Sequence, residues 1–192
     1  MLDGRYAAIL NRLWDFLARG LVRAGLSPNA VTAMGLALVA LAAASYLVHR
    51  DDRLFGACLA VAFAFDGLDG AVARLSGRAS RFGGYFDAVV DRYQELMALA
   101  AIAWVHDVWP AAFLVVTGSF LTSYNKARVA LEMPVDNLEW PDLIERLERL
   151  LILIGILLFG VVGPGLIVLG VLAHLTAVQR FLRARRRLLA AR

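Results

Sequence analysis

Six long apolar stretches, separated by short polar segments, dominate this chain of 192 residues. Each stretch carries few charged side chains, and several approach the roughly 20 residues that a helix needs to cross the hydrocarbon core of a bilayer. The pattern therefore predicts an all-α, polytopic membrane protein with six transmembrane helices. We place these helices at about residues 30–48, 54–75, 82–105, 109–129, 150–162 and 166–182.

The N-terminal residues follow a different pattern. Apolar side chains recur at helical spacing over residues 2–23, and arginines lie between them. An amphipathic helix of this kind lies in the headgroup region of a membrane instead of crossing it. The predicted organisation is an interfacial helix over residues 1–25, a six-span domain over residues 26–188 and a tail over residues 189–192. Ser27 or Asn29 is the expected N-cap of the first span.

Basic residues are distributed unevenly among the connections between the predicted spans. With six spans, both chain ends lie on the side that also receives the connections over residues 76–81 and 130–149. Most arginines outside the spans fall on this side, whereas the opposite side receives Arg50 and Arg53 beside two aspartates. An excess of Lys and Arg marks cytoplasmic loops. The sequence thus predicts an integral protein of the cytoplasmic membrane with both termini in the cytoplasm.

Composition excludes some classes of protein. Hydrophobic residues make up 60% of the chain, more than in an average soluble domain. The single cysteine, Cys58, excludes an intrachain disulfide framework. The net charge of +4 includes a basic stretch over residues 183–187, for which we expect contact with anionic membrane lipids and not with nucleic acid.

Four aspartates interrupt the second and third predicted spans: Asp66, Asp69, Asp87 and Asp91. If these spans form an antiparallel hairpin around residues 76–81, Asp66 and Asp91 both lie about 13 Å from the turn. Each aspartate costs about 2.5–3.5 kcal/mol at the centre of a spanning helix, and carboxylates at one depth also repel. Divalent cations with hard oxygen ligands would relieve both costs. The pattern predicts one metal site near the cytoplasmic surface, and structural pairing of each aspartate with an arginine is the alternative.

Cations gather at the cytoplasmic ends of the predicted spans. Metal ions and arginines together are typical of sites for phosphate or pyrophosphate, because the metal neutralises a leaving phosphate and Arg donates two hydrogen bonds to its oxygens. Gly70 and Gly83 would let a ligand approach the backbone closely. The cations are Arg74, Arg78, Arg81, Lys126, Arg128, Arg146, Arg149 and Arg180.

The hairpin carries a pattern of fixed spacing. It reads Asp66-Gly-Leu-Asp69-Gly70-Ala-Val-Ala73-Arg74, then eight residues, then Gly83-Gly-Tyr-Phe-Asp87-Ala-Val-Val-Asp91. This resembles the signature of the CDP-alcohol phosphotransferases, D-x2-D-G-x2-A-R-x8-G-x3-D-x3-D, at every fixed position. The resemblance implies an integral membrane transferase. An acceptor hydroxyl would attack the lipid-bearing phosphorus of a CDP-linked lipid, and CMP would leave.

The resemblance also implies roles for individual residues. Asp66, Asp69, Asp87 and Asp91 would bind two divalent cations, Mg²⁺ or Mn²⁺, and Asp91 would also be the general base. Members of the family commonly form homodimers. The residues expected to bind the CDP group are Thr32, Asp66, Asp69, Gly70, Ala73, Arg74, Ser80 and Gly83.

Three further elements indicate the acceptor alcohol. They are Ser123-Tyr-Asn-Lys126-Ala-Arg128, Ile144-Glu-Arg146-Leu-Glu-Arg149-Leu and Thr176-Ala-Val-Gln179-Arg180. They resemble elements of the phosphatidylinositol-phosphate and archaetidylinositol-phosphate synthases, although Leu147 replaces a proline and the insert over residues 131–140 is acidic. The resemblance implies that Lys126, Arg128, Arg146 and Arg180 bind the phosphate of inositol 1-phosphate.

Alternatives remain open at this stage. Glycerol 3-phosphate would need the same cations, which keeps phosphatidylglycerophosphate synthase as a second candidate. The lipid could be CDP-diacylglycerol or CDP-archaeol. A membrane cation transporter would also hold acidic residues within its spans, but it predicts such residues at several depths, and the far half of the spans lacks them. A lipid-binding scaffold would not need the complete aspartate signature.

Overall fold

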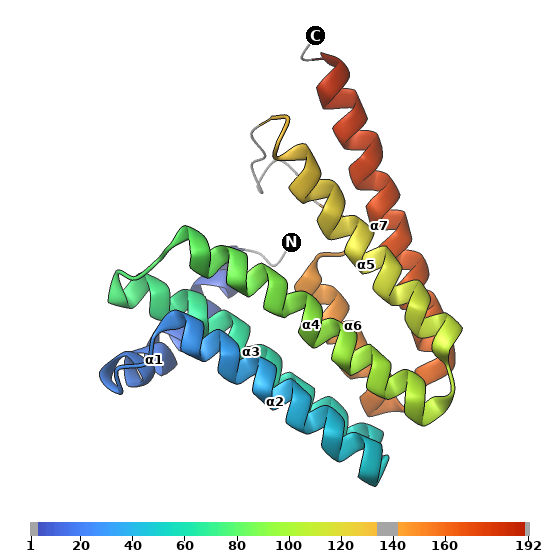
Figure 1. The fold of residues 1–192 in the computed structure, drawn as a ribbon, viewed down its shortest axis with the longest axis horizontal. Coiled ribbons are helices and arrows are strands. Elements are labelled where there is room, and N and C mark those ends of the chain that lie inside the picture. Colours follow the sequence, from blue (N-terminus) through green and yellow to red (C-terminus); the bar gives the residue numbers. More distant parts are fainter. Residues whose placement is uncertain (1–3, 134–141, 191–192) are drawn as a thin grey trace. The chain divides into compact units, whose positions relative to one another are not determined.

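The computed structural model describes the backbone of residues 4–133 and 142–190, and the side chains from residue 14 onward within these ranges. The described residues form α-helices and no strand (Figure 1), which confirms the all-α prediction. The helices are α1 (Gly4–Arg23), α2 (Pro28–His49), α3 (Asp52–Ser76), α4 (Arg81–His106), α5 (Trp109–Val129), α6 (Arg146–Phe159) and α7 (Val162–Ala190).

Each predicted helix corresponds to an observed one. Three of them, α2, α3 and α7, are long and apolar enough to cross a membrane. The largest difference concerns α7, which continues to Ala190 instead of ending near residue 182. Leu, Ala and Arg all have high helix propensity, so the basic stretch over residues 183–187 extends the helix. The predicted acidic insert covers residues 131–140, and its residues 134–140 lie outside the described residues, as do residues 141 and 191–192.

Capping residues define the ends of the helices that carry the aspartates. The side chain of Ser27, one of the two expected caps, accepts a hydrogen bond from the backbone N–H of Ala30 and caps α2. Asp51 caps α3 in the same way. Gly77 ends α3 with φ of 66°, a left-handed conformation that glycine adopts without steric cost. The turn between α3 and α4 is therefore short, as the hairpin prediction requires.

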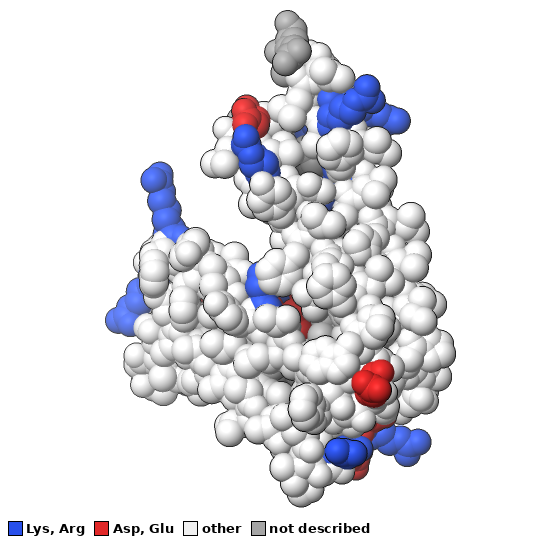
Figure 2. Space-filling model, turned by 45° about the vertical axis from the view of Figure 1, so that its right-hand side comes forward, with Lys and Arg blue, Asp and Glu red and all other residues white. Residues whose placement is uncertain are grey.

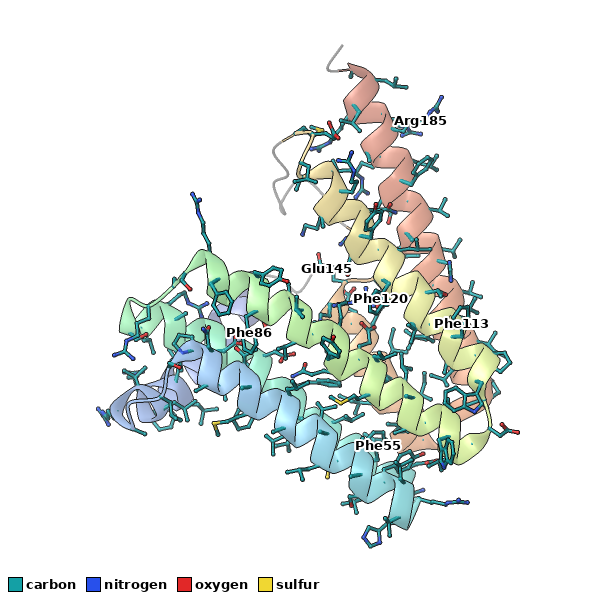
Figure 3. All side chains as sticks on the ribbon, viewed as in Figure 1. Phe55, Phe86, Phe113, Phe120, Glu145 and Arg185 are labelled. Atoms are coloured by element: carbon teal, nitrogen blue, oxygen red, sulfur yellow. The ribbon has the colours of Figure 1, made fainter. Side chains whose placement is uncertain are left out.

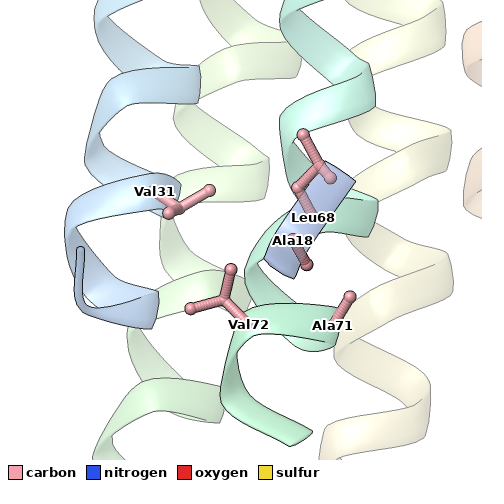
Figure 4. Packing of buried hydrophobic residues seen from close by; sticks show 5 residues of the cluster. All are labelled: Ala18, Val31, Leu68, Ala71 and Val72. Carbon is pink, nitrogen blue, oxygen red and sulfur yellow. The ribbon is translucent and has the colours of Figure 1, made fainter. Parts of the chain in front are cut away.

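The chain divides into two compact units, residues 1–98 and residues 99–192. In the first unit, α1 and α2 both pack against α3. The core of this contact is a cluster of buried residues, Ala18, Val31, Leu68, Ala71 and Val72 (Figure 4). The cluster lies on the half of α3 that carries the aspartate pattern. Packing of α1 and α2 therefore fixes the helix on which that pattern is built.

The second unit is built on close packing of α5 along α7, which lie side by side in Figure 1. Small residues make this approach possible. A Cβ atom added to Gly118 would lie 2.9 Å from the Cβ of Ala173, and one added to Gly170 would lie 2.7 Å from Cγ of Leu114. Thr122 Oγ1 crosses the same interface and lies 3.2 Å from the carbonyl oxygen of Ala173.

Large apolar side chains also cover the outside of the helices. Phe113 and Phe120 of α5 are 69% and 42% exposed and are labelled in Figure 3. Most of the face visible in Figure 2 is uncharged. Exposed apolar surface on this scale is unusual for a soluble monomer and is typical of helices that contact lipid.

We predict that Gly118→Ala destabilises the second unit by about 1–3 kcal/mol, because the added methyl group overpacks the α5–α7 interface. Gly155→Ala is the matched control, because a Cβ atom added to Gly155 meets nothing within 4 Å. Thermal unfolding of both variants in detergent measures the difference. Equal melting temperatures for the two variants would show that α5 and α7 are not packed as tightly as described.

Candidate active site

A cavity of about 280 Å³ opens beside the turn between α3 and α4 in the first unit. The start of α2, the end of α3 and the start of α4 surround it. Asn29 and Asp87 are among its lining residues. So are seven of the eight residues predicted to bind CDP: Thr32, Asp69, Gly70, Ala73, Arg74, Ser80 and Gly83. Asp66, the eighth, does not line this cavity and lies about one turn before Asp69 on α3.

Two helix N-termini beside this cavity make it suitable for an anion. Two of the three helices present their N-terminal turns to it, where backbone N–H groups have no partner within the helix. The Ser80 hydroxyl uses one of these groups, because it accepts a hydrogen bond from Gly83 N at 2.9 Å. The exposed guanidinium of Arg74 adds a positive charge, and its contact with Asp15, at 3.9 Å, is too long and too exposed to hold it strongly.

Gly83 lies at a close approach between α2 and the α3–α4 turn. A Cβ atom added to Gly83 would lie 3.1 Å from Oγ of Ser80 and 3.3 Å from Oδ1 of Asn29. A side chain at this position would therefore need Ser80 and Asn29 to shift by a few tenths of an ångström. The glycine of the sequence pattern therefore preserves the space in which the three chain segments meet.

A hydrogen bond between two helices holds one of the aspartates. Thr32 Oγ1 on α2 donates to Oδ2 of Asp69 on α3. The two residues are 3% and 6% exposed, so the hydrogen bond is shielded from bulk water. A buried hydrogen bond to a carboxylate is stronger than one between neutral groups. Thr32 therefore fixes the orientation of Asp69 at the wall of the cavity.

The four predicted metal ligands lie on the facing ends of α3 and α4. Asp69 and Asp87 line the cavity from the two helices. Asp66 precedes Asp69 by three residues and Asp91 follows Asp87 by four, so each pair shares one helical face. One oxygen atom of Asp66, Asp87 and Asp91 is buried.

This donor set suits a hard divalent cation. Carboxylate oxygens are the ligands that Mg²⁺ and Mn²⁺ prefer. Across residues 4–133 and 142–190, no three acidic, histidine or cysteine side chains already converge as a group of ligands. Carboxylates at one site repel one another, and a cation between them removes that repulsion.

One cation near the aspartates was not predicted from the sequence. Arg92 Nη1 lies 2.7 Å from Oε2 of Glu95, and Arg92 Nη2 lies 4.0 Å from Oδ2 of Asp91. Glu95 is 3% exposed, and Arg92 compensates its charge inside the first unit. The three-residue spacing of Arg92 and Glu95 along a helix was the available signal in the sequence.

The four predicted acceptor cations all belong to the second unit. Lys126 and Arg128 lie in the last turn of α5, and Arg128 forms an exposed ion pair with Glu132 at 2.6 Å. Arg146 is the first residue of α6. Arg180 on α7 is paired with Asp142, a residue that the sequence pattern did not single out.

Comparison with known proteins shows similarity to one family along most of the chain. The family model for CDP-alcohol phosphatidyltransferases matches residues 25–179. The archaetidylinositol phosphate synthase of Pyrococcus horikoshii is 33% identical over 173 residues, covering 90% of each chain. The phosphatidylinositol phosphate synthase of Mycobacterium tuberculosis is 34% identical over 191 residues, covering 90% of this chain and 86% of that one.

Solved structures of the M. tuberculosis enzyme are also similar. The structure with CDP-DAG bound has a TM-score of 0.76 and 27% identity, covering 90% of this chain and 94% of the other. The structure in complex with manganese and citrate has a TM-score of 0.75 and 28% identity, covering 89% and 88%.

We predict that Thr32→Val weakens binding of CDP in the presence of Mn²⁺ about five- to tenfold, because the buried Asp69 carboxylate loses a hydrogen bond. Thr32→Ser keeps the hydroxyl group and should bind CDP nearly as well as the natural protein. Calorimetric titration of the purified proteins measures both affinities. An unchanged affinity for Thr32→Val would show that the Thr32–Asp69 hydrogen bond does not support the nucleotide site.

Proposed function

Because the chain belongs to the CDP-alcohol phosphatidyltransferase family and is a membrane transferase, we propose that it transfers a phosphatidyl-type group from a CDP-linked lipid to inositol 1-phosphate and releases CMP. The observation that carries this proposal is the cavity at the α3–α4 turn, which gathers most of the predicted CDP contacts from three helices. The transporter interpretation is set aside, since the family consists of transferases.

The CDP group binds in this cavity, with its phosphates near Arg74 and the N-terminal turns of α2 and α4. Gly70 and Gly83 leave room for the nucleotide beside the helix backbones. Ala73, which also lines the cavity, has a small side chain that takes up little of this space. Thr32, Ser80, Asp66 and Asp69 complete the proposed contacts. The donor is CDP-diacylglycerol or CDP-archaeol, because relatives of the chain include synthases of phosphatidylinositol phosphate and of archaetidylinositol phosphate.

Asp66, Asp69, Asp87 and Asp91 hold the metal, with two divalent cations of the Mg²⁺ or Mn²⁺ type as the proposed cofactors. A manganese complex of a related synthase supports this proposal. The metal, when bound, neutralises the pyrophosphate and the CMP that leaves. The protein's own contribution is to hold these carboxylates on rigid helices below the turn.

Asp91 accepts the proton of the acceptor hydroxyl as the oxygen forms its bond to the lipid-bearing phosphorus. The bond between this phosphorus and the bridging oxygen breaks, and that oxygen leaves as part of CMP. Asp91 suits this role because it lies about one turn beyond Asp87, which lines the cavity. A carboxylate positioned in this way can supply general base catalysis.

Lys126, Arg128, Arg146 and Arg180 form the proposed site for the acceptor phosphate. Two observations support a phosphorylated acceptor. The relatives named above are inositol phosphate synthases. The cations also come from three separate helices of one compact unit, α5, α6 and α7.

The proposed membrane arrangement has six spans, in which α4, α5 and α6 cross the bilayer together with α2, α3 and α7. The exposed phenylalanines of α5 support lipid contact for a helix outside the three most apolar ones. α1 lies at the interface, where Phe16 is 69% exposed while Ala18 packs on α3. Both termini and the mouth of the site face the cytoplasm, and the protein forms a homodimer as is common in the family.

We predict that the purified protein, given CDP-lipid and Mn²⁺, incorporates labelled inositol 1-phosphate into lipid in preference to glycerol 3-phosphate, inositol or serine. The cations of α5, α6 and α7 pair with a phosphate monoester, which favours inositol 1-phosphate over inositol and serine. The similarity to inositol phosphate synthases favours it over glycerol 3-phosphate. Parallel assays with the four labelled acceptors measure the preference. Preferential use of glycerol 3-phosphate would make the protein a phosphatidylglycerophosphate synthase and would refute the inositol assignment.

We predict that Asp91→Asn lowers kcat at least about a hundredfold while CDP-lipid still binds, because general base catalysis is lost and three aspartates remain for the metal. Asp107→Asn, an exposed acid-to-amide change in the α4–α5 turn, is the matched control and should keep full activity. Turnover and CDP-lipid binding are measured on the same preparations. Normal turnover by Asp91→Asn would remove the base role from this residue.

A further inference from the structure

A buried ion pair joins α7 to the segment that leads into α6. Nε of Arg180 lies 2.9 Å from Oδ1 and 3.0 Å from Oδ2 of Asp142, and Nη2 donates to Oδ2. The side chains of Arg180 and Asp142 are 11% and 2% exposed. The carboxylate therefore meets the guanidinium along its Nε–Nη2 edge, away from bulk solvent.

This pairing leaves part of the guanidinium available to a ligand. Nη1 of Arg180 also donates to the carbonyl oxygen of Thr122 on α5 at 2.6 Å. A guanidinium has five N–H groups, and these contacts use three of them. Among the described residues, the other two N–H groups, one on Nη1 and one on Nη2, make no hydrogen bond. Arg180 can thus bind a second oxyanion without releasing Asp142.

The neighbouring residues attach the same segment to α7 a second time. Leu143 N donates to Oε1 of Gln179 at 2.9 Å, so two successive residues are bound by two successive residues of α7. Three residues after Leu143, Arg146 begins α6. Glu145 accepts from the backbone of this first turn and its N–H donates to Glu148. Arg146 therefore has little freedom to move relative to Arg180.

We propose that Asp142 is a positioning residue of the acceptor site, acting through Arg180. Its carboxylate holds the Arg180 guanidinium in one orientation. It also fixes the segment that precedes α6 against α7. Arg180 and Arg146 therefore keep one arrangement for the acceptor phosphate. This inference rests on the proposed function, because it concerns the phosphorylated acceptor. If Asp142 instead competed with the acceptor phosphate for Arg180, removing its carboxylate would lower the acceptor KM.

The test is a double-mutant cycle of Asp142→Ala and Arg180→Ala, assayed with CDP-lipid and inositol 1-phosphate. Asp142→Ala should raise the acceptor KM about tenfold or more, because the freed guanidinium no longer holds one orientation. The KM for CDP-lipid should stay within about twofold of the natural value, which a general loss of structure would not allow. In the Arg180→Ala background, Asp142→Ala should have no further effect on the acceptor KM.

Two results would overturn the inference. A lower acceptor KM for Asp142→Ala would mean that the carboxylate competes with the phosphate. The same increase in both backgrounds would mean that Asp142 acts through another residue. Asp142→Asn covers the case in which the alanine variant does not fold, because its amide oxygen still accepts from Nε; it should raise the acceptor KM less than alanine does. Asp107→Asn is the exposed control for the loss of one acid.

An assay of the natural protein distinguishes failure of the proposed function from failure of this inference. If the natural protein uses no phosphorylated acceptor, that result refutes the proposed function before any variant is compared. The pairing is then tested by thermal unfolding in detergent without acceptor. The melting temperature of the double variant should be no lower than that of Arg180→Ala alone, because the second change removes the stranded carboxylate. Additive losses would refute the pairing of Asp142 with Arg180.

Discussion

The structure depends on the cost of placing carboxylates among apolar helices. An aspartate on a spanning helix is tolerated only where something compensates its charge. Here Thr32 donates a hydrogen bond to Asp69, and Asp69 and Asp87 line a cavity that helix N-termini also face. Asp69 and Asp87 are therefore the two aspartates of the pattern that line this polar cavity, whereas Asp66 and Asp91 lie about one turn farther from the α3–α4 turn.

Close packing of α1 on α3 holds the helix that carries two of the aspartates. Trp14 of α1 lies against Gly67, where an added Cβ atom would be 3.0 Å from the indole ring. The residues on either side of Gly67 are an aspartate of the pattern and buried Leu68, which belongs to the cluster shared with α1 and α2. A metal site needs ligands held within narrow limits, and the N-terminal helix contributes by closing the back of α3. The amphipathic pattern of α1 thus serves packing on α3 as well as the proposed contact with lipid.

Features that are local in the chain could be predicted from the sequence, and features that depend on distant contacts could not. Long apolar runs, together with helical periodicity in α1, predicted a helix for each helix that the structure describes, and Ser27 was one of two expected caps. The family resemblance implied the residues that bind CDP, and seven of those eight residues line the cavity. By contrast, Asp142 lies 38 residues from Arg180, in a segment with no periodicity, so only the folded chain brings the two together. The helical extension of α7 was missed because basic residues were interpreted as a tail, although their propensity favours helix.

Two of the ion pairs in the second unit, Arg128–Glu132 and Arg180–Asp142, differ in how easily a bound phosphate could replace the carboxylate. Arg128 and Glu132 are about half exposed, at 51% and 50%, so water already competes with their contact and a phosphate can replace Glu132 at little cost. Asp142 is 2% exposed, and removing it from Arg180 would strand two desolvated charges. An acceptor phosphate is thus expected to displace the exposed carboxylate and to add to the buried pair. The exposed cation can adapt to different acceptors, whereas the buried pair keeps one geometry, and it is this fixed geometry that can distinguish one phosphorylated alcohol from another.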